Sequence, residues 1–498
     1  GSEMCIRDRA MVARIAIGGT GAMRFEAREY QKTAIAWVQD HPRCLLFLDM
    51  GLGKTVSTLT AFMELQAYGE AERMLVVAPK KVAESTWSDE CAKWEHLRGL
   101  RVSVVLGERK RREAALREDA DVYVTSRDNF VWLCEHYRNR LPFDMVVLDE
   151  LSSFKTPGSL RFKAARRALP DVARVVGLTG TPAPNGLKDL WAQVYCIDGG
   201  ARLGRFVTHF RQRWFDVRTV NNIPVKITPK RGAQEEIEAA IGDITLSMQA
   251  KDWLELPEMI INERLVRLDE KAMRRYRDFE RQEILLFADE SAHTGQMGAD
   301  RPGLPGRSLE NGTAGGSVIA NGAASLMNKL SQFANGAVYD DEKSWHAEHD
   351  AKIEALKECV EAADTPVLVY YQYQSDRERI SKALGKETRV YADERDLHDW
   401  NAGKIPVLLA HPMSTAFGLN MQHGGRHIVW YSTGWNLELW LQGNARLHRQ
   451  GQTRPVVVTA LIAAGTVDER MMRSLREKKS VQSALLNNIS YLCKRNGI

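Results

Sequence analysis

The sequence predicts an α/β protein with two domains, each a mainly parallel sheet flanked by helices, and with helical insertions between them. Three observations support this prediction. Short apolar runs rich in β-branched residues alternate with segments of helical periodicity in both halves of the chain. The halves are separated by residues 292–322, which are rich in small and polar residues and lack an apolar period, so we expect a flexible loop there. The first apolar run is followed by a turn that contains two glycines and a lysine.

Composition excludes several classes of protein. The 498 residues suffice for two to four domains, and the apolar fraction of 44% and charged fraction of 27% are ordinary for a globular protein. No apolar run approaches the roughly 20 residues that span a bilayer, so we expect no membrane partner. The seven cysteines form no CxxC pair, which argues against a zinc site or a disulfide framework and favours the cytoplasm.

The formal net charge of +5 does not by itself indicate a nucleic-acid partner, but the charges cluster. Residues 202–231 contain eight cations and one acid, with four aromatic residues among them. This pattern is typical of a phosphate-binding surface with stacking groups. It is equally typical of an amphipathic helix whose aromatic residues are core and whose arginines are solvated.

The turn at residues 49–55, DMGLGKT, follows an apolar run at residues 44–48 that predicts a buried parallel strand. A strand, a glycine turn and a helix N-terminus together form a cradle for phosphate, because the glycines let main-chain N–H groups turn inward. Lys54 can reach the β- and γ-phosphates of a nucleotide and the Thr55 hydroxyl can hold Mg²⁺. The alternative is a glycine turn followed by a chance Lys-Thr pair, since the strict pattern requires glycine where this chain has Leu48.

Two further features flank this loop. Residues 25–38 predict a short helix, and its Gln31 could hydrogen-bond an adenine edge, although a helical glutamine is more often simply exposed. Residues 143–148 predict a buried strand that ends in Asp149 and Glu150. An aspartate at that place can hold Mg²⁺ through water, and the following glutamate can polarise an attacking water molecule.

Four more apolar runs complete the expected sheet of the first half: 74–79, 102–106, 121–125 and 175–178. The loops after them offer hydroxyl and cationic groups for phosphates, among them Lys80, Lys81, Thr125, Ser126 and Arg127. The hydroxyls of Thr179 and Thr181 suit either a relay between nucleotide and nucleic acid or a capped turn. We expect Trp87 and Trp94, one heptad apart, to be core residues.

The second half predicts another parallel sheet, with strands at 367–371, 407–410, 428–431 and 456–460 and without a second phosphate loop. Residues 414–420 follow one strand, and residues 442–452 follow another on a polar helix. Arg446 and Arg449 are three apart and are expected to share a helical face. They could stabilise charge on a transferring phosphoryl group, or they could belong to a solvent-facing charged helix.

Together these segments resemble the motifs of superfamily 2 helicases, in the same order and over residues 24–485. The later ones (LTGTPAPN, STAFGLN and QGNARLHRQGQ) resemble the Swi/Snf family more than the DEAD-box family. The resemblance implies two RecA-like lobes with ATP and Mg²⁺ in the cleft between them. It also implies a double-stranded DNA translocase that hydrolyses ATP to move along DNA and to remodel DNA or protein–DNA complexes.

Matching each motif assigns roles to single residues. Catalytic roles fall on Lys54, Glu150, Arg446 and Arg449. Contacts to ATP fall on Gln31, Gly51, Leu52, Gly53, Lys54, Thr55 and Asp149, of which Thr55 and Asp149 hold Mg²⁺, partly through water. Coupling between the lobes falls on Thr179, Thr181, Gly418, Asn420 and Gln442. Contacts to DNA fall on Pro79, Lys80, Thr125, Ser126, Ser414 and Thr415.

The resemblance also implies an arrangement of domains. The expected order is an N-terminal extension at 1–23, a first lobe at 24–200, a helical and basic insertion at 201–345, a second lobe at 346–485 and a tail at 486–498. The initial Gly-Ser resembles a cloning remnant, and a natural start could lie at Met11 or Met23. We expect a monomer of a small bacterial or phage type that acts in the cytoplasm, with a protein partner as an option.

One departure from the family pattern concerns the acidic motif. The family sequence Asp-Glu-Ala-His is here Asp149-Glu150-Leu151-Ser152, so the histidine that helps to couple hydrolysis to motion is a serine. We expect ATP hydrolysis to survive and coupling to differ. Two alternatives to a translocase therefore stay open: a helicase that separates strands or branched DNA, and an ATP-gated clamp that hydrolyses slowly.

Overall fold

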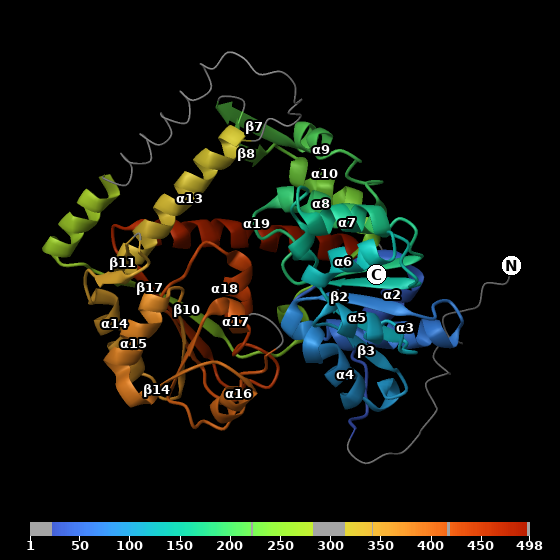
Figure 1. Cartoon of the computed structure of the whole chain (residues 1–498), viewed down its shortest axis with the longest axis horizontal. Helices are drawn as coiled ribbons and strands as arrows, with labels where there is room; N and C mark the ends of the chain where they lie inside the picture. The colour runs from blue at the N-terminus through green and yellow to red at the C-terminus, as the bar shows by residue number, and fades with distance from the viewer. Residues whose placement is uncertain (1–21, 221–222, 282–313, 341, 416–418, 496–498) are drawn as a thin grey trace.

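A computed structural model describes residues 22–220, 223–281, 314–340, 342–415 and 419–495. The chain folds into two lobes, each a parallel sheet covered by helices on both faces (Figure 1). The α/β class expected from the alternating apolar runs is confirmed. The central strands of both sheets are buried, which explains why they read as unbroken apolar runs, whereas the edge strands β10 (Met259–Val266) and β14 (Thr388–Val390) are partly exposed.

The first lobe is organised by seven strands in the order β3-β4-β2-β5-β6-β1-β9, all parallel. Their bounds are β1 Arg43–Leu48, β2 Met74–Ala78, β3 Val102–Val105, β4 Val122–Ser126, β5 Met145–Asp149, β6 Arg174–Thr179 and β9 Thr245–Met248. The first six match the predicted runs to within two residues. β9 was missed, and it corrects the predicted boundary at residue 200, because this strand from the expected insertion completes the first sheet beside β1.

The second lobe has six parallel strands in the order β10-β17-β16-β13-β15-β14. Their bounds are β10 Met259–Val266, β13 Val367–Tyr370, β14 Thr388–Val390, β15 Val407–Ala410, β16 His427–Trp430 and β17 Val456–Ala463. β10 also falls within the expected insertion, yet it pairs with β17 over eight residues. The stretch 201–345 is therefore divided between both lobes rather than set apart from them.

The helices of the first lobe are α2 Glu29–Asp40, α3 Lys54–Ala67, α4 Trp87–Lys93, α5 Arg109–Ala115, α6 Arg127–His136, α7 Leu160–Ala168, α8 Leu190–Asp198 and α10 Ala233–Ile241. Those of the second lobe are α14 Ala351–Glu361, α15 Gln374–Leu384, α16 Glu394–Asn401, α17 Pro412–Thr415 and α18 Leu437–Asn444. Other helices are α9 Val207–Trp214, α11 Ala250–Trp253, α13 Ala314–Asn335 and α19 Val467–Arg495. No helix in the described ranges is long and apolar enough to cross a membrane.

The basic and aromatic stretch forms α9 and a hairpin of β7 Phe215–Val220 and β8 Ile223–Pro229. Phe210, Trp214 and Phe215 are buried, and Phe206 is exposed. The guanidinium of Arg213 lies 4.4 Å from the ring centroid of Trp214. This arrangement favours the amphipathic interpretation for the aromatic residues, since three of the four serve as core and are not free to stack on bases.

The loop expected at 292–322 is corrected at its C-terminal end, because α13 already begins at Ala314. Residues 292–313 lie outside the described part of the chain. The helix is anchored by Leu326, Leu330, Phe333 and Ala334, which recur at helical spacing and are buried. An apolar face that lies mainly beyond residue 322 thus supports a helix that starts among small residues.

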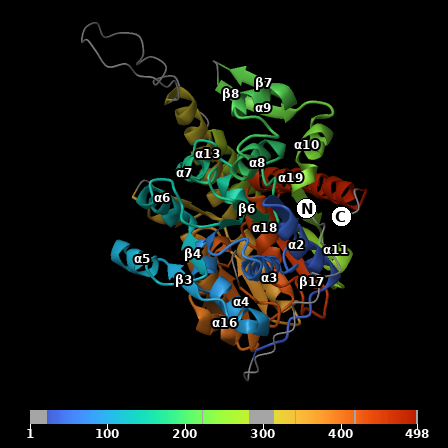
Figure 2. The ribbon, with the colours of Figure 1, turned by 90° about the vertical axis from the view of Figure 1, so that its right-hand side faces the viewer.

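The last helix, α19, joins the two lobes and runs along both of them (Figures 1 and 2). Met472 and Leu475 belong to the core of the second lobe, whereas Leu485 and Ile489 belong to the core of the first. The hydroxyl of Ser247 on β9 donates to the carbonyl of Leu486 at 3.1 Å. The segment expected to be a tail from residue 486 therefore begins inside the core of the first lobe.

Candidate nucleotide-binding site between the lobes

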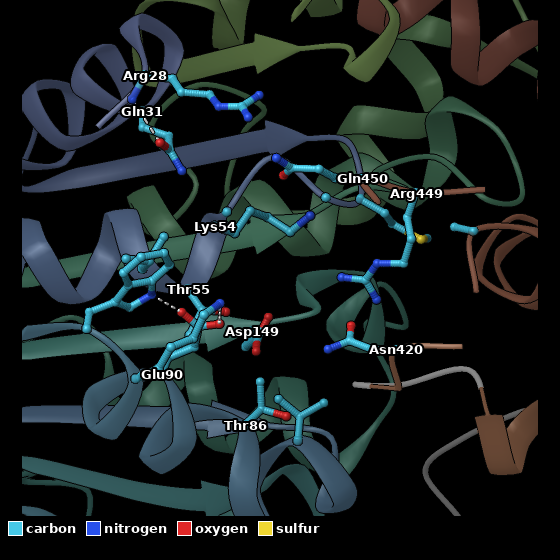
Figure 3. A pocket seen from close by; sticks show the side chains of 18 of the residues that line it. Arg28, Gln31, Lys54, Thr55, Thr86, Glu90, Asp149, Asn420, Arg449 and Gln450 are labelled. Atoms are coloured by element: carbon cyan, nitrogen blue, oxygen red, sulfur yellow. Dashed lines mark hydrogen bonds and ion pairs between the residues drawn. The ribbon is translucent and has the colours of Figure 1, made fainter. Parts of the chain in front are cut away.

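A cleft of about 690 Å³ lies between the lobes (Figure 3). Of the residues expected in the site, the cleft is lined by Gln31, Gly51, Gly53, Lys54, Thr55, Pro79, Asp149, Glu150, Asn420, Gln442, Arg446 and Arg449. Figure 3 shows Lys54 and Thr55 facing Asn420, Arg449 and Gln450 across it. Leu52 does not line the cleft because its side chain is fully buried, and Gly418 lies outside the described residues.

The phosphate loop has the backbone that its glycines permit. Gly51 and Gly53 have φ values of 86° and 70°, a left-handed region that side chains with a Cβ rarely adopt. A Cβ at Gly53 would also lie 2.7 Å from the amide nitrogen of Gln31. Gln31 is fixed in turn, since its Oε1 accepts a hydrogen bond from the Arg28 main-chain N–H at 2.9 Å. The glutamine amide is thus held against the loop.

Lys54 is the first residue of α3 and lies at the end of the neighbouring strand. Its Nζ donates to the carbonyl oxygens of Leu48 at 2.7 Å and Asp49 at 3.2 Å. Burial lowers the pKa of Lys54, although the charges of Glu150 and Asp149 act in the opposite direction. The ammonium group is therefore only partly compensated, and an anion in the cleft would stabilise it.

Asp149 ends β5 and is held from behind by a tryptophan. The indole N–H of Trp87 donates to Oδ2 of Asp149 at 3.1 Å. Burial, followed by the charge of Glu150, raises the pKa of Asp149 to about 6. The expectation that Trp87 is a core residue is correct, since it is buried, but the same side chain also orients a carboxylate of the cleft. No feature of the sequence indicated this bond.

Glu150 has a left-handed backbone, with φ 57°, and its carboxylate collects donors from both lobes. Oε1 accepts from Thr179 Oγ1 at 2.9 Å and Thr181 Oγ1 at 3.5 Å. Oε2 accepts from Nε2 of Gln442 in α18 at 3.3 Å. A non-glycine residue with this backbone is uncommon, and such strain is typical of functional sites. The threonine pair and the glutamine thus meet at one carboxylate.

The two arginines lie beyond α18, which ends at Asn444, so the expectation that they share a helical face is wrong. The reason is local: Nε of Arg446 donates to the carbonyl of Gln442 at 3.0 Å, which is the acceptor that a continuing helix would use. Nη1 of Arg446 and of Arg449 both donate to the carbonyl of Leu419, at 2.9 and 3.0 Å. Burial lowers the pKa of both guanidinium groups.

Three of the hydroxyls expected to contact DNA are already committed. Thr125 is fully buried, and its hydroxyl donates to the Val105 carbonyl at 3.0 Å. Thr415 is fully buried, and its hydroxyl donates to that of Tyr370 at 3.3 Å. Ser126 caps α6, where its Oγ accepts from the main chain. In this conformation the structure contradicts the expected phosphate contacts of the two threonine hydroxyls, because each is buried and bonded within its own lobe.

The remaining predicted DNA contacts lie where the lobes approach each other. Pro79 is buried, whereas the side chain of Lys80 is 73% exposed. The neighbouring Lys81 donates from Nζ to the main-chain carbonyl of Ser414 in the second lobe at 2.9 Å. The segments that follow β2 and β15 thus touch each other through Lys81 and Ser414 of α17, and Lys80 takes no part in that contact.

Sequence reasoning singled out Ser152 as the replacement for a histidine, but it missed Glu438 and the contact between the two side chains. Ser152 is fully buried and donates from Oγ to Glu438 in the second lobe at 3.1 Å. Glu438, Gln442 and Arg446 follow one another at intervals of four residues, so helical spacing could have placed the glutamate beside the glutamine. The three-dimensional contact with Ser152, 286 residues away, has no signal in the sequence.

Comparison with known proteins agrees with this arrangement. The profile of the SNF2-related domain matches residues 30–300, which is more than half of the chain. The chain belongs to the SNF2-related family. This finding confirms the resemblance to the Swi/Snf family that the motifs indicate.

Relatives of this SNF2-related protein include a phage protein and DNA repair proteins. Protein p41 of Acyrthosiphon pisum secondary endosymbiont phage 1 is 39% identical over 477 residues, which cover 93% of this chain and 98% of p41. The DNA repair and recombination protein RAD54B of Mus musculus is 23% identical over 88% of this chain, but the chain spans only 53% of RAD54B. The solved SWI2/SNF2 ATPase core of Sulfolobus solfataricus in complex with dsDNA is 20% identical over 96% of both chains, with a TM-score of 0.43.

Proposed function

We propose that this SNF2-related protein is an ATP-dependent translocase on double-stranded DNA. The observation that carries the proposal is the cleft itself, where Lys54 and the acidic pair of the first lobe face the buried Arg446 and the half-buried Arg449 of the second. Neither arginine forms an ion pair with a carboxylate within the described part of the chain. Guanidinium groups that form no ion pair there, beside a loop with the backbone of a phosphate cradle, fit a nucleotide polyphosphate.

Each residue of the cleft then has a task. Gln31 contacts the adenine ring of ATP, and the loop 51–55 surrounds the phosphates. The Thr55 hydroxyl and Asp149 hold Mg²⁺, an oxygen donor set that suits this ion. When bound, ATP and Mg²⁺ supply the reacting phosphoryl group and part of the charge that neutralises it. Glu150 holds the attacking water and accepts its proton.

Movement follows from the division of these groups between two bodies. The first lobe carries the phosphate loop and the catalytic base Glu150; it comprises residues 24–200 and β9. The second lobe carries Arg446 and Arg449; it comprises residues 346–485 and β10. The arginines stabilise charge on the reacting phosphoryl group only when the lobes are closed. Glu150 accepts hydrogen bonds from Thr179 and Thr181 of the first lobe and from Gln442 of the second. These bonds couple the state of the cleft to the relative position of the lobes.

DNA contacts are proposed at the meeting point of the segments that follow β2 and β15. Lys80 is the exposed cation there, and Ser414 lies opposite, in contact with Lys81. Opening and closing of the lobes changes the separation of these two segments. The change moves one DNA contact along a DNA strand relative to the other. Contacts to phosphate carry no sequence information, so we expect binding that tolerates any sequence.

The first experiment measures the ATPase rate with no nucleic acid, double-stranded DNA, single-stranded DNA and RNA. We expect stimulation by duplex DNA, followed by displacement of a triplex-forming strand from a duplex track. Stimulation by single strands or RNA instead would replace the translocase with a strand-separating helicase. No stimulation by any of them would replace it with a protein-gated switch.

Two variants test the site assignment in the same assay. Lys54→Ala removes the cation at the phosphates and Glu150→Gln removes the base, so we expect each to reduce turnover to near background. Lys32→Ala, which changes an exposed lysine on α2 paired with Glu29, serves as the matched control. Ordinary turnover in Lys54→Ala or Glu150→Gln would refute the assignment.

A further inference from the structure

The side chain of Glu438 is largely buried against the first lobe and does not line the cleft. Its Oε1 accepts from Ser152 Oγ at 3.1 Å, and its Oε2 lies 3.6 Å from Nζ of Lys155. Both partners belong to the first lobe. Within its own helix, Gln442 Nε2 donates to the same Oε1 at 3.5 Å. Glu438 is thus a residue of the second lobe whose best contacts are all across the interface.

Ser152 connects this glutamate to Glu150. Its Oγ lies 3.2 Å from Oε1 of Glu150 and 3.1 Å from Oε1 of Glu438. One hydroxyl proton cannot be donated fully to two carboxylates at once. The arrangement is satisfied when Glu438 carries a proton and donates it to Ser152, which then donates to Glu150. The hydroxyl is fully buried, so no water competes for these bonds and leaving one unmade is costly.

The groups around Glu438 are consistent with a shared proton. Burial and the charge of Glu150 raise the pKa of Glu438 to about 7, against the opposing effects of Lys155, the Ser152 hydroxyl and Arg127. This shift favours the neutral form of the carboxyl group, which relieves its repulsion with Glu150.

We propose that Glu438 is a positioning residue for ATP hydrolysis, which acts through Ser152 to hold the Glu150 carboxylate in place from the second lobe. The proposal rests on the proposed function of Glu150 as the base. It assigns the pair Ser152 and Glu438 to the place where the Swi/Snf pattern has a single histidine. When the lobes close, α18 brings Glu438, which orients the catalytic base Glu150. The turn after α18 brings Arg446 and Arg449 at the same time.

The first test is a double-mutant cycle with Ser152→Ala, Glu438→Ala and the pair combined. We expect each single change to lower kcat about tenfold and to leave KM for ATP within about twofold, because neither side chain lines the cleft. The double variant should be no slower than the slower single variant, because the two residues act as one unit. Additive losses, or an unchanged kcat in Glu438→Ala, would overturn the proposal.

Two variants separate positioning from general damage to the fold. Glu438→Gln keeps a hydrogen-bonding group of the same length, so we expect kcat to recover to within about threefold of the parent rate. Glu361→Ala changes an exposed glutamate at the end of α14 and should have no effect. A Glu438→Gln variant as slow as Glu438→Ala would show that the hydrogen bond to Ser152 is not what matters.

A measurement without turnover tests the link between Glu438 and Ser152 separately from the proposed function. Amide hydrogen exchange of the protein without nucleotide should accelerate at residues 150–155 in Glu438→Ala and stay unchanged in Glu361→Ala, since the link to Ser152 is lost only in the first. Unchanged exchange there would overturn the link even if the ATPase assay succeeded. Faster exchange in a protein that proves inactive towards ATP would instead refute the proposed function and leave the link standing.

Discussion

At the scale of single residues, the acids of the cleft are held by neighbours that face away from it. Asp149 accepts from the indole of Trp87, and Glu150 accepts from Thr179. Such partners fix the direction of a carboxylate without touching what it binds, and their loss typically costs a metal site one to two orders of magnitude in affinity. A residue that reads as plain core in the sequence can therefore be essential to the chemistry.

Replacing Trp87 with phenylalanine tests this role. The ring stays and the N–H donor to Asp149 is lost, so we expect the Mg²⁺ concentration for half-maximal ATPase activity to rise about tenfold. A Mg²⁺ titration of turnover gives the value. Trp214→Phe is the matched control, because the indole of Trp214 donates to Glu236 and does not line the cleft. Equal Mg²⁺ requirements in both variants would contradict the role of Trp87.

At the scale of elements, α19 is the helix that ties the molecule together. It follows β17 of the second lobe, and its C-terminal half fills the core of the first beside β9. The links that consequently join the lobes include the packing of α19 and the pair of hydrogen bonds from Gln442 to Glu150 and from Ser152 to Glu438. We infer that the helix limits how far the lobes can separate.

Shortening a buried side chain of α19 should affect a different lobe at each end of the helix. Leu485→Ala leaves a cavity in the core of the first lobe, and we expect it to reduce the free energy of unfolding by about 2–5 kcal/mol. Met471→Ala acts on the other end, where Met471 packs with Val467 and Tyr276. Denaturant unfolding followed through hydrogen exchange distinguishes the lobes. Loss of protection in the second lobe alone with Leu485→Ala would contradict the packing.

The hydrogen bond between His349 and Phe333 of α13 predicts that the folded protein loses stability in acid. His349 donates from Nε2 to the carbonyl of Phe333 at 2.9 Å, while its Nδ1 is buried without a partner. Burial lowers its pKa from 6.5 to about 4, and Arg379 and Lys352 add to this effect. Because the folded pKa is below the unfolded one, this stability is complete above pH 6.5 and is lost as pH falls towards 4.

His349→Gln keeps an N–H donor and removes the titration. We expect the fall in melting temperature between pH 7 and pH 5 to be smaller in this variant than in the parent protein. The comparison uses thermal unfolding at both pH values. A fall of the same size in both proteins would exclude His349 as a source of acid sensitivity.

At the scale of the whole molecule, the places where the described parts of the two lobes meet include the cleft, the contact of Lys81 with Ser414, the contact of Ser152 with Glu438, and the packing of α19. Only the second of these lies beside an exposed cation of the proposed DNA path. Binding that depends on phosphate contacts releases counterions, so the logarithm of the affinity should fall linearly with the logarithm of the salt concentration.

Lys80→Ala should therefore weaken duplex binding equally for unrelated sequences. We expect the slope of log affinity against log salt to become shallower by about 1, the contribution of one phosphate contact. Fluorescence anisotropy of labelled duplexes over a range of salt concentrations measures it, with Lys32→Ala as the control. An unchanged slope would exclude Lys80 from the interface.

The phosphate loop, the acidic pair and most of the strands could be predicted from the sequence because they depend on neighbours in the chain. A buried parallel strand is continuously apolar, and a phosphate turn needs glycines at fixed places. The same is true of Gln31, Lys54 and Asp149, which the structure brings to one cleft. Thr125 and Thr415 could not be judged in this way, since whether a hydroxyl faces a ligand or the core of its lobe depends on which distant segments pack against it.

Only the tertiary structure decided which distant segments meet. β9 and β10 join sheets far from them in sequence, and Ser152 touches Glu438 at a separation of 286 residues. Arg446 and Arg449 were identified as a pair, but their geometry depends on the carbonyl of Leu419 rather than on a helical period. Local patterns encode local conformation, whereas contacts between lobes depend on how whole sheets and helices pack, and no periodicity along the chain records that.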